Sequence, residues 1–368
     1  MKKNDIKTLA FYLPQFHPIE ENDKWWGKGF TEWTNVTRSK PKFEGHYQPH
    51  LPSHFGFYDL RLHETMIEQA DLARKYGIHG FIFYHYWFNG KRILNRPIDQ
   101  WVENKTPDFP FCLCWANENW TRRWDGLDDE VLLHQNYSDE DDIEHIRFLI
   151  QIFADKRYIK INGRPLVFIY RTELLKDPKK TAEIWREECK KASFPDVFLV
   201  RIESHSRSAN PNQIGFDAAG EFAPDWNQRG EHLFSNWFNF QLKKLGILPK
   251  EKLENRIYSY ETLVKNMLAK KTPDYKLFRG VCPSWDNSAR RKTDATIFLD
   301  SSPELYGKWL KEIISRTVNA HSEEEQFILI NAWNEWAEGC HLEPDQKYGM
   351  QYLEETKKAL KESGFNIT

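Results

Sequence analysis

The sequence predicts a single (β/α)8 barrel that spans residues 1–368. Three observations lead to this fold class. Apolar runs of strand length alternate with helix-like stretches along the whole chain, the runs number eight, and each run ends in a cluster of polar or aromatic residues. The predicted strands cover residues 8–16, 80–88, 111–119, 164–171, 197–204, 216–224, 277–286 and 327–335.

The strands are apolar almost throughout, which predicts a parallel sheet whose two faces are both covered. Between the strands, helices are predicted over residues 63–77, 138–155, 177–193, 302–320 and 346–363. The first of them should end at Gly77, and the second should begin at Ser138, followed by acidic residues that favour a helix N-terminus. An open doubly wound sheet is the main alternative. However, the segment GKGF (27–30) does not match the glycine-rich turn of nucleotide-binding sheets.

The segments between the predicted strands and helices indicate a single domain in which two connections are unusually long. We find no low-complexity tract, no short repeat and no linker rich in proline, glycine or serine that would divide the chain. Residues 17–58, after the first strand, and about 225–255, after the sixth, are too long to be plain turns. Long connections in compact domains usually form walls or lids of functional sites.

Composition excludes several classes of function. Lys plus Arg total 52 and Asp plus Glu total 54, so bulk charge does not predict binding to nucleic acid or to an anionic membrane. No apolar run approaches the ~20 residues of a membrane span, and the N-terminus lacks the pattern of a secretory signal. We therefore expect a cytoplasmic protein. The 5 cysteines form no CxxC pair, and we predict neither a metal site nor a cofactor.

Tryptophan is unusually frequent, with 15 Trp beside 15 Tyr and 25 Phe. Core packing accounts for most of the phenylalanines, but many tryptophans adjoin Asn, Asp, Glu or Arg, as in residues 23–33, 84–90, 114–124 and 331–336. Aromatic rings stack on the C–H faces of sugars while neighbouring polar groups bind the hydroxyls. The sequence therefore predicts an oligosaccharide or polysaccharide as the partner.

In a barrel, functional side chains gather at the carboxyl ends of the strands. The residues that we predict to bind substrate follow the apolar runs or lie in the first long connection: Tyr12, Gln15, His17, Trp33, His85, Trp87, Trp115, Asn117, Asn119, Glu203, Glu221, Trp285, Asp286, Trp333 and Asn334. Some alternatives stay open. His17 and His85 suit a hydrogen-bonded core position equally well, and Trp33 suits either a lid or a buried anchor. If its strand continues, Glu118 points away from the face of Asn117 and Asn119.

Glu335 and Glu338 follow the last apolar run, in the segment NAWNEWAEG (331–339). Residues three apart in a regular strand point to opposite faces, so the two carboxylates converge only if the chain bends between them, which Gly339 permits. The flanking indoles would exclude water and raise a carboxyl pKa. Glycoside cleavage requires two carboxyl groups, which makes this pair the predicted catalytic residues. The alternative is a pair of ordinary surface charges.

Four segments together make the sequence recognisable. Residues 10–36, 77–90, 114–126 and 331–345 resemble WbsX-like proteins, a family related to glycoside hydrolase family 99, and the likeness covers nearly the whole chain. The resemblance implies a (β/α)8 barrel and carbohydrate-active chemistry, with Glu335 as base and Glu338 as acid. In family 99 the base is thought to deprotonate the sugar 2-hydroxyl, giving a 1,2-anhydro-sugar intermediate and net retention. Ala337 stands where that family typically has His, which places the mannose specificity in doubt.

Three functions are compatible with these features. The first is a retaining glycoside hydrolase that acts on an α-linked glycan of a bacterial surface polysaccharide, such as lipopolysaccharide O-antigen or capsule. The second is a glycosyltransferase or transglycosylase of polysaccharide biosynthesis, for which we find no convincing diphosphate site. The acidic segment LDD (127–129) is a weak candidate for its metal ligands. The third is a carbohydrate-binding barrel without catalysis, against which the intact glutamate pair argues.

Overall fold

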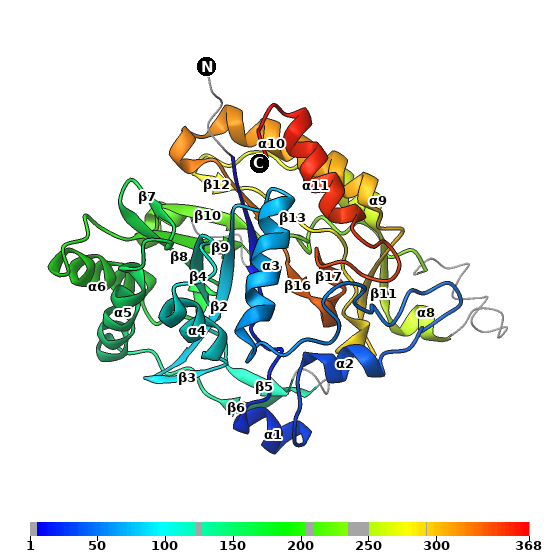
Figure 1. Ribbon diagram of the computed structural model, residues 1–368, viewed down its shortest axis with the longest axis horizontal. Helices are drawn as coiled ribbons and strands as arrows, with labels where there is room; N and C mark the ends of the chain where they lie inside the picture. Colours follow the sequence, from blue (N-terminus) through cyan, green and yellow to red (C-terminus); the bar gives the residue numbers. More distant parts are fainter. Residues whose placement is uncertain (1–5, 123–126, 204–209, 235–249, 292, 368) are drawn as a thin grey trace.

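The computed structural model describes residues 6–122, 127–203, 210–234, 250–291 and 293–367 (Figure 1). Within these ranges, parallel strands occupy the eight positions of a barrel, which confirms the predicted fold class. The barrel strands are β1 (Lys7–Tyr12), β2 (Gly80–Phe88), β4 (Phe111–Trp115), β8 (Arg164–Ile169), β9 (Phe198–Glu203), β10 (Ala218–Glu221), β12 (Leu277–Phe278) continued by β13 (Gly280–Val281), and β15 (Phe327–Ile330).

The seventh barrel strand, formed by β12 and β13, joins the two ends of the sheet and closes the barrel. Only Arg279 separates β12 from β13; β12 pairs with β10, and β13 pairs with β15. On the other side, β15 pairs in parallel with β1, from Lys7 opposite Phe327 to Ala10 opposite Ile330. A Cβ atom at Gly280 would collide with the backbone carbonyl of Glu221, so a glycine is needed where the seventh strand approaches the sixth.

The predicted helices are present with shorter ends. They are α3 (His63–Lys75), α5 (Asp139–Phe153), α6 (Pro178–Lys191), α10 (Pro303–Ala320) and α11 (Gln351–Glu362). Gly77 follows the end of α3 with φ +89°, a value that favours glycine. The Ser138 hydroxyl accepts a hydrogen bond from the Asp141 N–H and caps α5. The structure also contains helices that were not predicted from the sequence: α1 (Glu20–Trp26), α2 (Glu32–Arg38), α4 (Arg96–Asn104), α8 (Lys250–Glu254) and α9 (Tyr260–Ala269).

Several strands end earlier than predicted, because polar and turn-forming residues follow directly on the apolar runs. The third barrel strand ends at Trp115, the seventh at Val281 and the eighth at Ile330. Short strands lie at the carboxyl ends of the barrel strands or between them: β3 (Lys91–Ile93), β5 (Trp120–Arg122), β6 (Leu127–Leu133), β7 (Lys160–Ile161), β11 (Arg256–Ser259), β14 (Thr296–Leu299), β16 (Asn334–Glu335) and β17 (Cys340–His341). Short 3-10 turns accompany them: η2 (Thr172–Leu174), η3 (Pro211–Ile214), η4 (Asn287–Ala289), η5 (Glu323–Glu325) and η6 (Trp336–Glu338).

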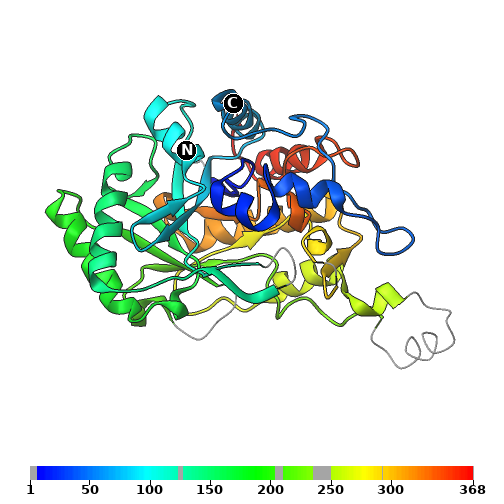
Figure 2. The same cartoon turned by 90° about the horizontal axis from the view of Figure 1, so that it is seen from below.

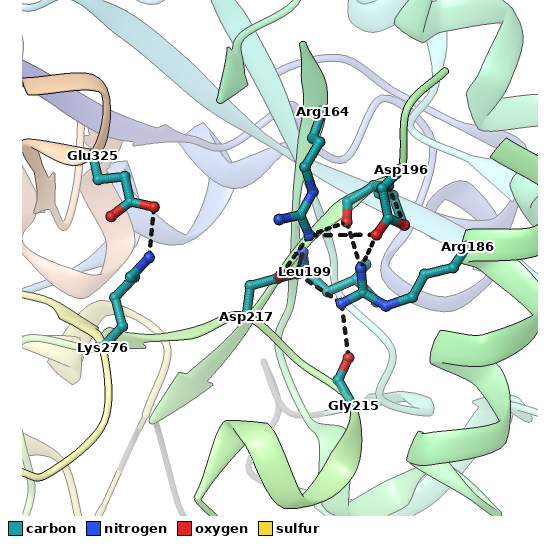
Figure 3. A network of polar contacts seen from close by, with 9 residues as sticks. Arg164, Arg186, Asp196, Leu199, Gly215, Asp217, Lys276 and Glu325 are labelled. Atoms are coloured by element: carbon teal, nitrogen blue, oxygen red, sulfur yellow. Dashed lines mark hydrogen bonds and ion pairs between the residues drawn. The ribbon is translucent and has the colours of Figure 1, made fainter. Parts of the chain in front are cut away.

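Ion pairs connect the amino ends of neighbouring strands (Figure 3). Asp217, just before β10, accepts from Arg164 of β8 and from Arg186 of α6. Arg186 also pairs with Asp196 at 2.8 Å, and Lys276 before β12 pairs with Glu325 before β15 at 2.5 Å. In barrels of this type the amino end serves stability, and the opposite end carries the site.

The carboxyl ends of the strands are covered by the first long connection and by a hairpin. Residues 17–58 contain α1 and α2, which lie with the β5–β6 hairpin along the lower edge of Figure 1, and Figure 2 shows this side face-on. Of the second long connection, residues 235–249 lie outside the described part of the chain. Among the helices that the structure describes, none has both the length and the apolar character that crossing a membrane requires.

Candidate active site

A pocket opens at the carboxyl ends of the barrel strands, where the fold predicts it. Its volume is about 790 Å³ when the open mouth is included. Its walls combine aromatic rings with charged and amide side chains. The lining residues are Leu13, Gln15, Tyr84, Tyr86, Ala116, Glu118, Asn119, Trp120, Thr121, Tyr170, Phe222, Arg290, Glu335 and Glu338.

Both predicted catalytic glutamates line this pocket, because the chain leaves strand geometry between them. Glu335 ends β16, the 3-10 turn η6 (Trp336–Glu338) follows, and Gly339 reverses the chain at φ +56° so that β17 can pair with β16. A Cβ atom at Gly339 would lie 3.0 Å from the carbonyl oxygen of Asp286. Since the backbone N–H of Asp286 also donates to the Glu338 carbonyl at 2.7 Å, the loop after the seventh strand holds this turn in place.

Arg290 binds three carboxylates at once. Its guanidinium contacts Glu335 Oε1 at 2.5 Å and Glu338 Oε1 at 2.7 Å. Its Nε and Nη2 atoms also donate to the two oxygens of Glu32, at 3.0 and 3.1 Å. Glu32 begins α2 and is fully buried, so a fixed anion from the first long connection lies against the guanidinium. Arg290 therefore sets the position of the two glutamates and offsets part of their mutual repulsion.

The environments of the two glutamates differ. The Glu335 side chain is 5% exposed and that of Glu338 is 22% exposed. Burial raises the pKa of Glu335 to about 8; the charges of Glu338 and Glu32 act in the same direction, and Arg290 opposes them. The pocket thus holds one deeply buried carboxyl group with a strong affinity for protons beside a second that is open to the pocket mouth.

Two of the predicted binding residues also line the pocket. Gln15 donates from Nε2 to the Tyr86 hydroxyl at 2.8 Å, and its Oε1 atom has no hydrogen-bond partner among the described residues. Asn119 accepts from the backbone N–H of Gln135. Glu118 lines the pocket as well, held by Arg171 at 2.6 Å. The expectation that Glu118 points away assumed a continuing strand, but the strand ends at Trp115.

The alternation of side chains along the strands places another group of predicted residues outside the pocket. On β2, Tyr84 and Tyr86 line the pocket, whereas His85 and Trp87 face the helices, where both rings contact His145 of α5. Trp115 on β4 and Tyr12 on β1 also face outwards, against Trp185 and Gln69. Because both faces of these strands are apolar, the sequence does not show which residues point inwards.

A third group supports the predicted catalytic turn, residues 335–339, which carries Glu335 and Glu338. Trp33 donates from its indole N–H to the Tyr58 carbonyl and packs on Trp336, so it is a buried anchor of the first long connection. Asn334 exchanges hydrogen bonds with the backbone of Leu13. Behind them lies the buried Glu343, which accepts from Trp336, Tyr58 and Gln69.

The remaining predicted residues lie in the core or in other polar clusters. Asn117 bridges to the backbone of Arg171, Glu203 pairs with Arg201, and Glu221 pairs with Lys270 and Arg279. Trp333 is a buried core residue, and His17 is buried with its pKa lowered to about 4. Trp285 and Asp286 line a second pocket. These positions show that a polar or aromatic strand end is not by itself a sign of a binding residue.

The second pocket lies between the first long connection and the segment after the predicted catalytic turn. Asp286 accepts there from His46 at 2.6 Å and from Gln48 at 2.9 Å. Within the described residues, one group has metal-ligand geometry: the buried side chains of His50, His341 and Asp345, which lie in this pocket. The side chains of the acidic segment 127–129, the weak candidate for metal ligands, lie outside what the structure describes.

The comparisons with known proteins agree with this fold. The family model described as "Glycosyltransferase WbsX" matches residues 8–356. The chain belongs to the WbsX family. Two relatives, both named WxcX, from Xanthomonas campestris pv. campestris strains B100 and ATCC 33913, are each 42% identical over 357 residues, which is 96% of this WbsX-family chain and 49% of theirs. The chain thus spans about half the length of these relatives.

Solved structures share the barrel at low sequence identity. A glycoside hydrolase-like protein superposes with a TM-score of 0.59 at 15% identity, covering 98% of this chain and 95% of its own. The endo-α-mannosidase of glycoside hydrolase family 99 from Bacteroides thetaiotaomicron superposes with a TM-score of 0.58 at 15% identity, covering 98% of both chains. At this sequence identity the likeness supports the barrel fold.

Proposed function

We propose that this chain is a retaining glycoside hydrolase that cleaves an α-linked glycan of a bacterial surface polysaccharide, such as lipopolysaccharide O-antigen or capsule. One observation carries the proposal: Glu335 and Glu338 line a single pocket and are held by the same guanidinium. Glycoside cleavage requires two carboxyl groups that flank one bond. The aromatic walls support a sugar ligand, because Tyr84, Tyr86, Trp120 and Tyr170 can stack on its apolar faces.

In the proposed reaction Glu338 is the acid and Glu335 the base. Glu338, which is open to the mouth, gives its proton to the glycosidic oxygen as the bond to C1 breaks. Glu335 takes the proton of the sugar 2-hydroxyl, whose oxygen closes on C1. Water then opens the anhydro-sugar: Glu338 takes the proton of the water, and Glu335 returns its proton to O2. The high proton affinity that burial gives Glu335 suits a base that acts on a weakly acidic hydroxyl.

Glycosyl transfer is the second candidate, and the description of the family favours it. A nucleotide-sugar transferase requires cationic groups that bind a diphosphate. Among the residues that the structure describes, Arg290 is the cation that lines the pocket, and its guanidinium already binds three carboxylates. This arrangement leaves it little capacity to bind a phosphate, and for that reason we rank hydrolysis above transfer.

A screen of defined α-linked glycans separates the two candidates. The purified chain is incubated with each glycan, with and without nucleotide sugars, and new reducing ends are followed by NMR. We expect turnover of a responsive glycan without any donor. If sugars are incorporated only when a nucleotide sugar is present, and none are released without it, the chain is a transferase and the proposed hydrolysis is wrong.

The pH dependence of kcat/KM tests whether Glu335 titrates as part of the active pair. The proposed mechanism requires Glu335 to be ionised while Glu338 is protonated, and burial raises the pKa of Glu335 to about 8. We therefore expect a bell-shaped profile whose alkaline limb lies near pH 8, because above this pH both carboxyl groups are ionised and no acid remains. That limb should shift in the residual activity of Glu335→Gln, and a limb that stays near pH 8 in this variant would contradict the assignment. Glu324→Gln, which removes an exposed carboxylate near the start of β15, should leave the profile unchanged.

A further inference from the structure

The second pocket contains three buried side chains that can bind a metal ion. His50 belongs to the first long connection, His341 to β17, and Asp345 to the segment that follows. One potential ligand atom from each lies within 4.8 Å of the other two. Ligands of a tetrahedral Zn²⁺ lie about 2.0–2.2 Å from the ion, and therefore about 3.4 Å from one another. Small side-chain shifts are thus enough to bring the three atoms around one ion.

Hydrogen bonds to the backbone orient the side chains of His341 and Asp345 for metal binding. His341 Nδ1 lies 2.9 Å from the Glu343 carbonyl oxygen. A carbonyl only accepts, so Nδ1 carries the proton and the Nε2 lone pair points towards His50 Nδ1, 3.0 Å away. A histidine that donates its other N–H to a backbone carbonyl is the usual arrangement at metal sites. Asp345 is oriented similarly, because its Oδ1 accepts from the Tyr348 N–H at 2.6 Å.

His46 and Lys347 also line this pocket, and both are already engaged. His46 donates from Nε2 to Asp286, because its Nδ1 accepts from the Lys42 N–H. Lys347 also lines the pocket, and its charge opposes a cation. Its Nζ atom, however, lies over the rings of Tyr47 and Tyr348, 4.7 and 4.6 Å from their centres, where the charge is partly compensated.

We propose that His50 Nδ1, His341 Nε2 and a carboxylate oxygen of Asp345 bind one divalent transition-metal ion. Two imidazoles and one carboxylate match Zn²⁺, with water in the fourth position. The proton that His50 Nδ1 donates to His341 in the absence of metal moves to His50 Nε2, so that both ligating nitrogens offer lone pairs.

This metal stabilises the catalytic turn and is separate from the catalytic pocket. His341 pairs with Asn334 across β16 and β17, and the adjacent Cys340 pairs with Glu335. The His341 ring also stacks on Trp336, with 3.8 Å between ring centres. An ion shared with His50 therefore links the first long connection to the back of the turn that carries Glu335 and Glu338.

Metal analysis of the tag-free chain tests the proposal. The protein is stripped with a chelator, incubated with ZnCl2, desalted and analysed by elemental mass spectrometry. We expect about one Zn²⁺ per chain and a rise of several degrees in Tm on adding the ion. His50→Ala and Asp345→Asn should each lose most of the bound metal and of the Tm rise. Asp345→Asn keeps the oxygen that accepts from Tyr348, so this variant is expected to fold.

His54→Ala is the matched control, because His54 is an exposed histidine of the same connection and lies outside the cluster. It should bind Zn²⁺ like the wild type. Co²⁺ provides a second readout: the wild type and the control should give the intense visible absorption of tetrahedral Co²⁺, which both ligand variants should lose. The proposal is overturned if the wild type retains no metal, or if a folded His50→Ala or Asp345→Asn variant retains as much as the wild type.

Discussion

Glu335→Gln and Glu338→Gln are each expected to lower kcat on a responsive glycan by about 10²–10⁴-fold, the usual contribution of a general acid or base. Glutamine keeps the shape of the side chain and its hydrogen bonds to Arg290, but it neither gives nor takes a proton at the required step. Because Arg290 retains two carboxyl partners in either variant, we expect the fold and glycan binding to persist. Turnover and binding are measured separately, by NMR of the products and by calorimetry.

The comparison between the two variants assigns the roles. A substrate with a good leaving group needs little acid assistance, so Glu338→Gln should recover much of its loss on an aryl glycoside, whereas Glu335→Gln should not. Glu324→Gln, which changes an exposed carboxylate outside the pocket, should keep wild-type turnover. Wild-type turnover in both pocket variants would show that this glutamate pair is not the catalytic pair.

Arg290→Met is expected to have the largest effect on stability. It leaves the buried Glu32 and Glu335, together with Glu338, without their shared cation. Breaking a buried ion pair by removing one partner costs about 3–5 kcal/mol, because the remaining charge stays buried and uncompensated. We therefore expect a loss of this size in the free energy of unfolding, measured in urea at pH 8, and a loss of activity at temperatures where the variant is still folded.

The pH dependence separates this electrostatic cause from a simple packing defect. Arg290 lowers the pKa of the buried Glu335, so without this cation that pKa rises further above its unfolded value. The deficit is therefore largest at high pH and shrinks as the carboxyl group is protonated at lower pH. A deficit that is the same at pH 8 and pH 5 would contradict the role assigned to Arg290. Arg256→Met is the matched control: its ion pair with Asp294 is exposed, and such pairs contribute about 0–1 kcal/mol.

The barrel could be predicted from sequence because its signals are local. Each apolar run, together with the polar cluster after it, appears in a single stretch of the chain, as in residues 80–90 or 327–339. The bend between Glu335 and Glu338 was also predictable, since a spacing of three allows convergence only outside strand geometry. The structure meets this requirement with a 3-10 turn and Gly339.

Some pocket residues could not be predicted from the sequence, because their role depends on the direction of a side chain or on a partner that is distant in the sequence. Tyr84 and Tyr86 line the pocket while His85 and Trp87 do not, yet all four lie in one buried run whose two faces look alike in sequence. Arg290 lies in the basic run SARRK (288–292), where nothing distinguishes it from a solvated charge; its partners Glu32 and Glu335 are 258 and 45 residues away.

The cluster of His50, His341 and Asp345 in the second pocket was not predicted for the same reason: its residues come from distant parts of the sequence. His50 and His341 are separated by 291 residues and match no metal-binding motif, so the sequence predicted no metal site. A ligand set assembled from two distant segments becomes visible only when the fold brings the segments together.

In the proposed function Glu335 and Glu338 open an α-glycosidic bond with retention at the carboxyl end of this barrel. The most direct test is the NMR spectrum of the new reducing end in the first minutes of the wild-type reaction on an α-linked glycan, before the anomers equilibrate. The proposed mechanism predicts that the α anomer appears first. Initial release of the β anomer would show inversion of configuration and would contradict it.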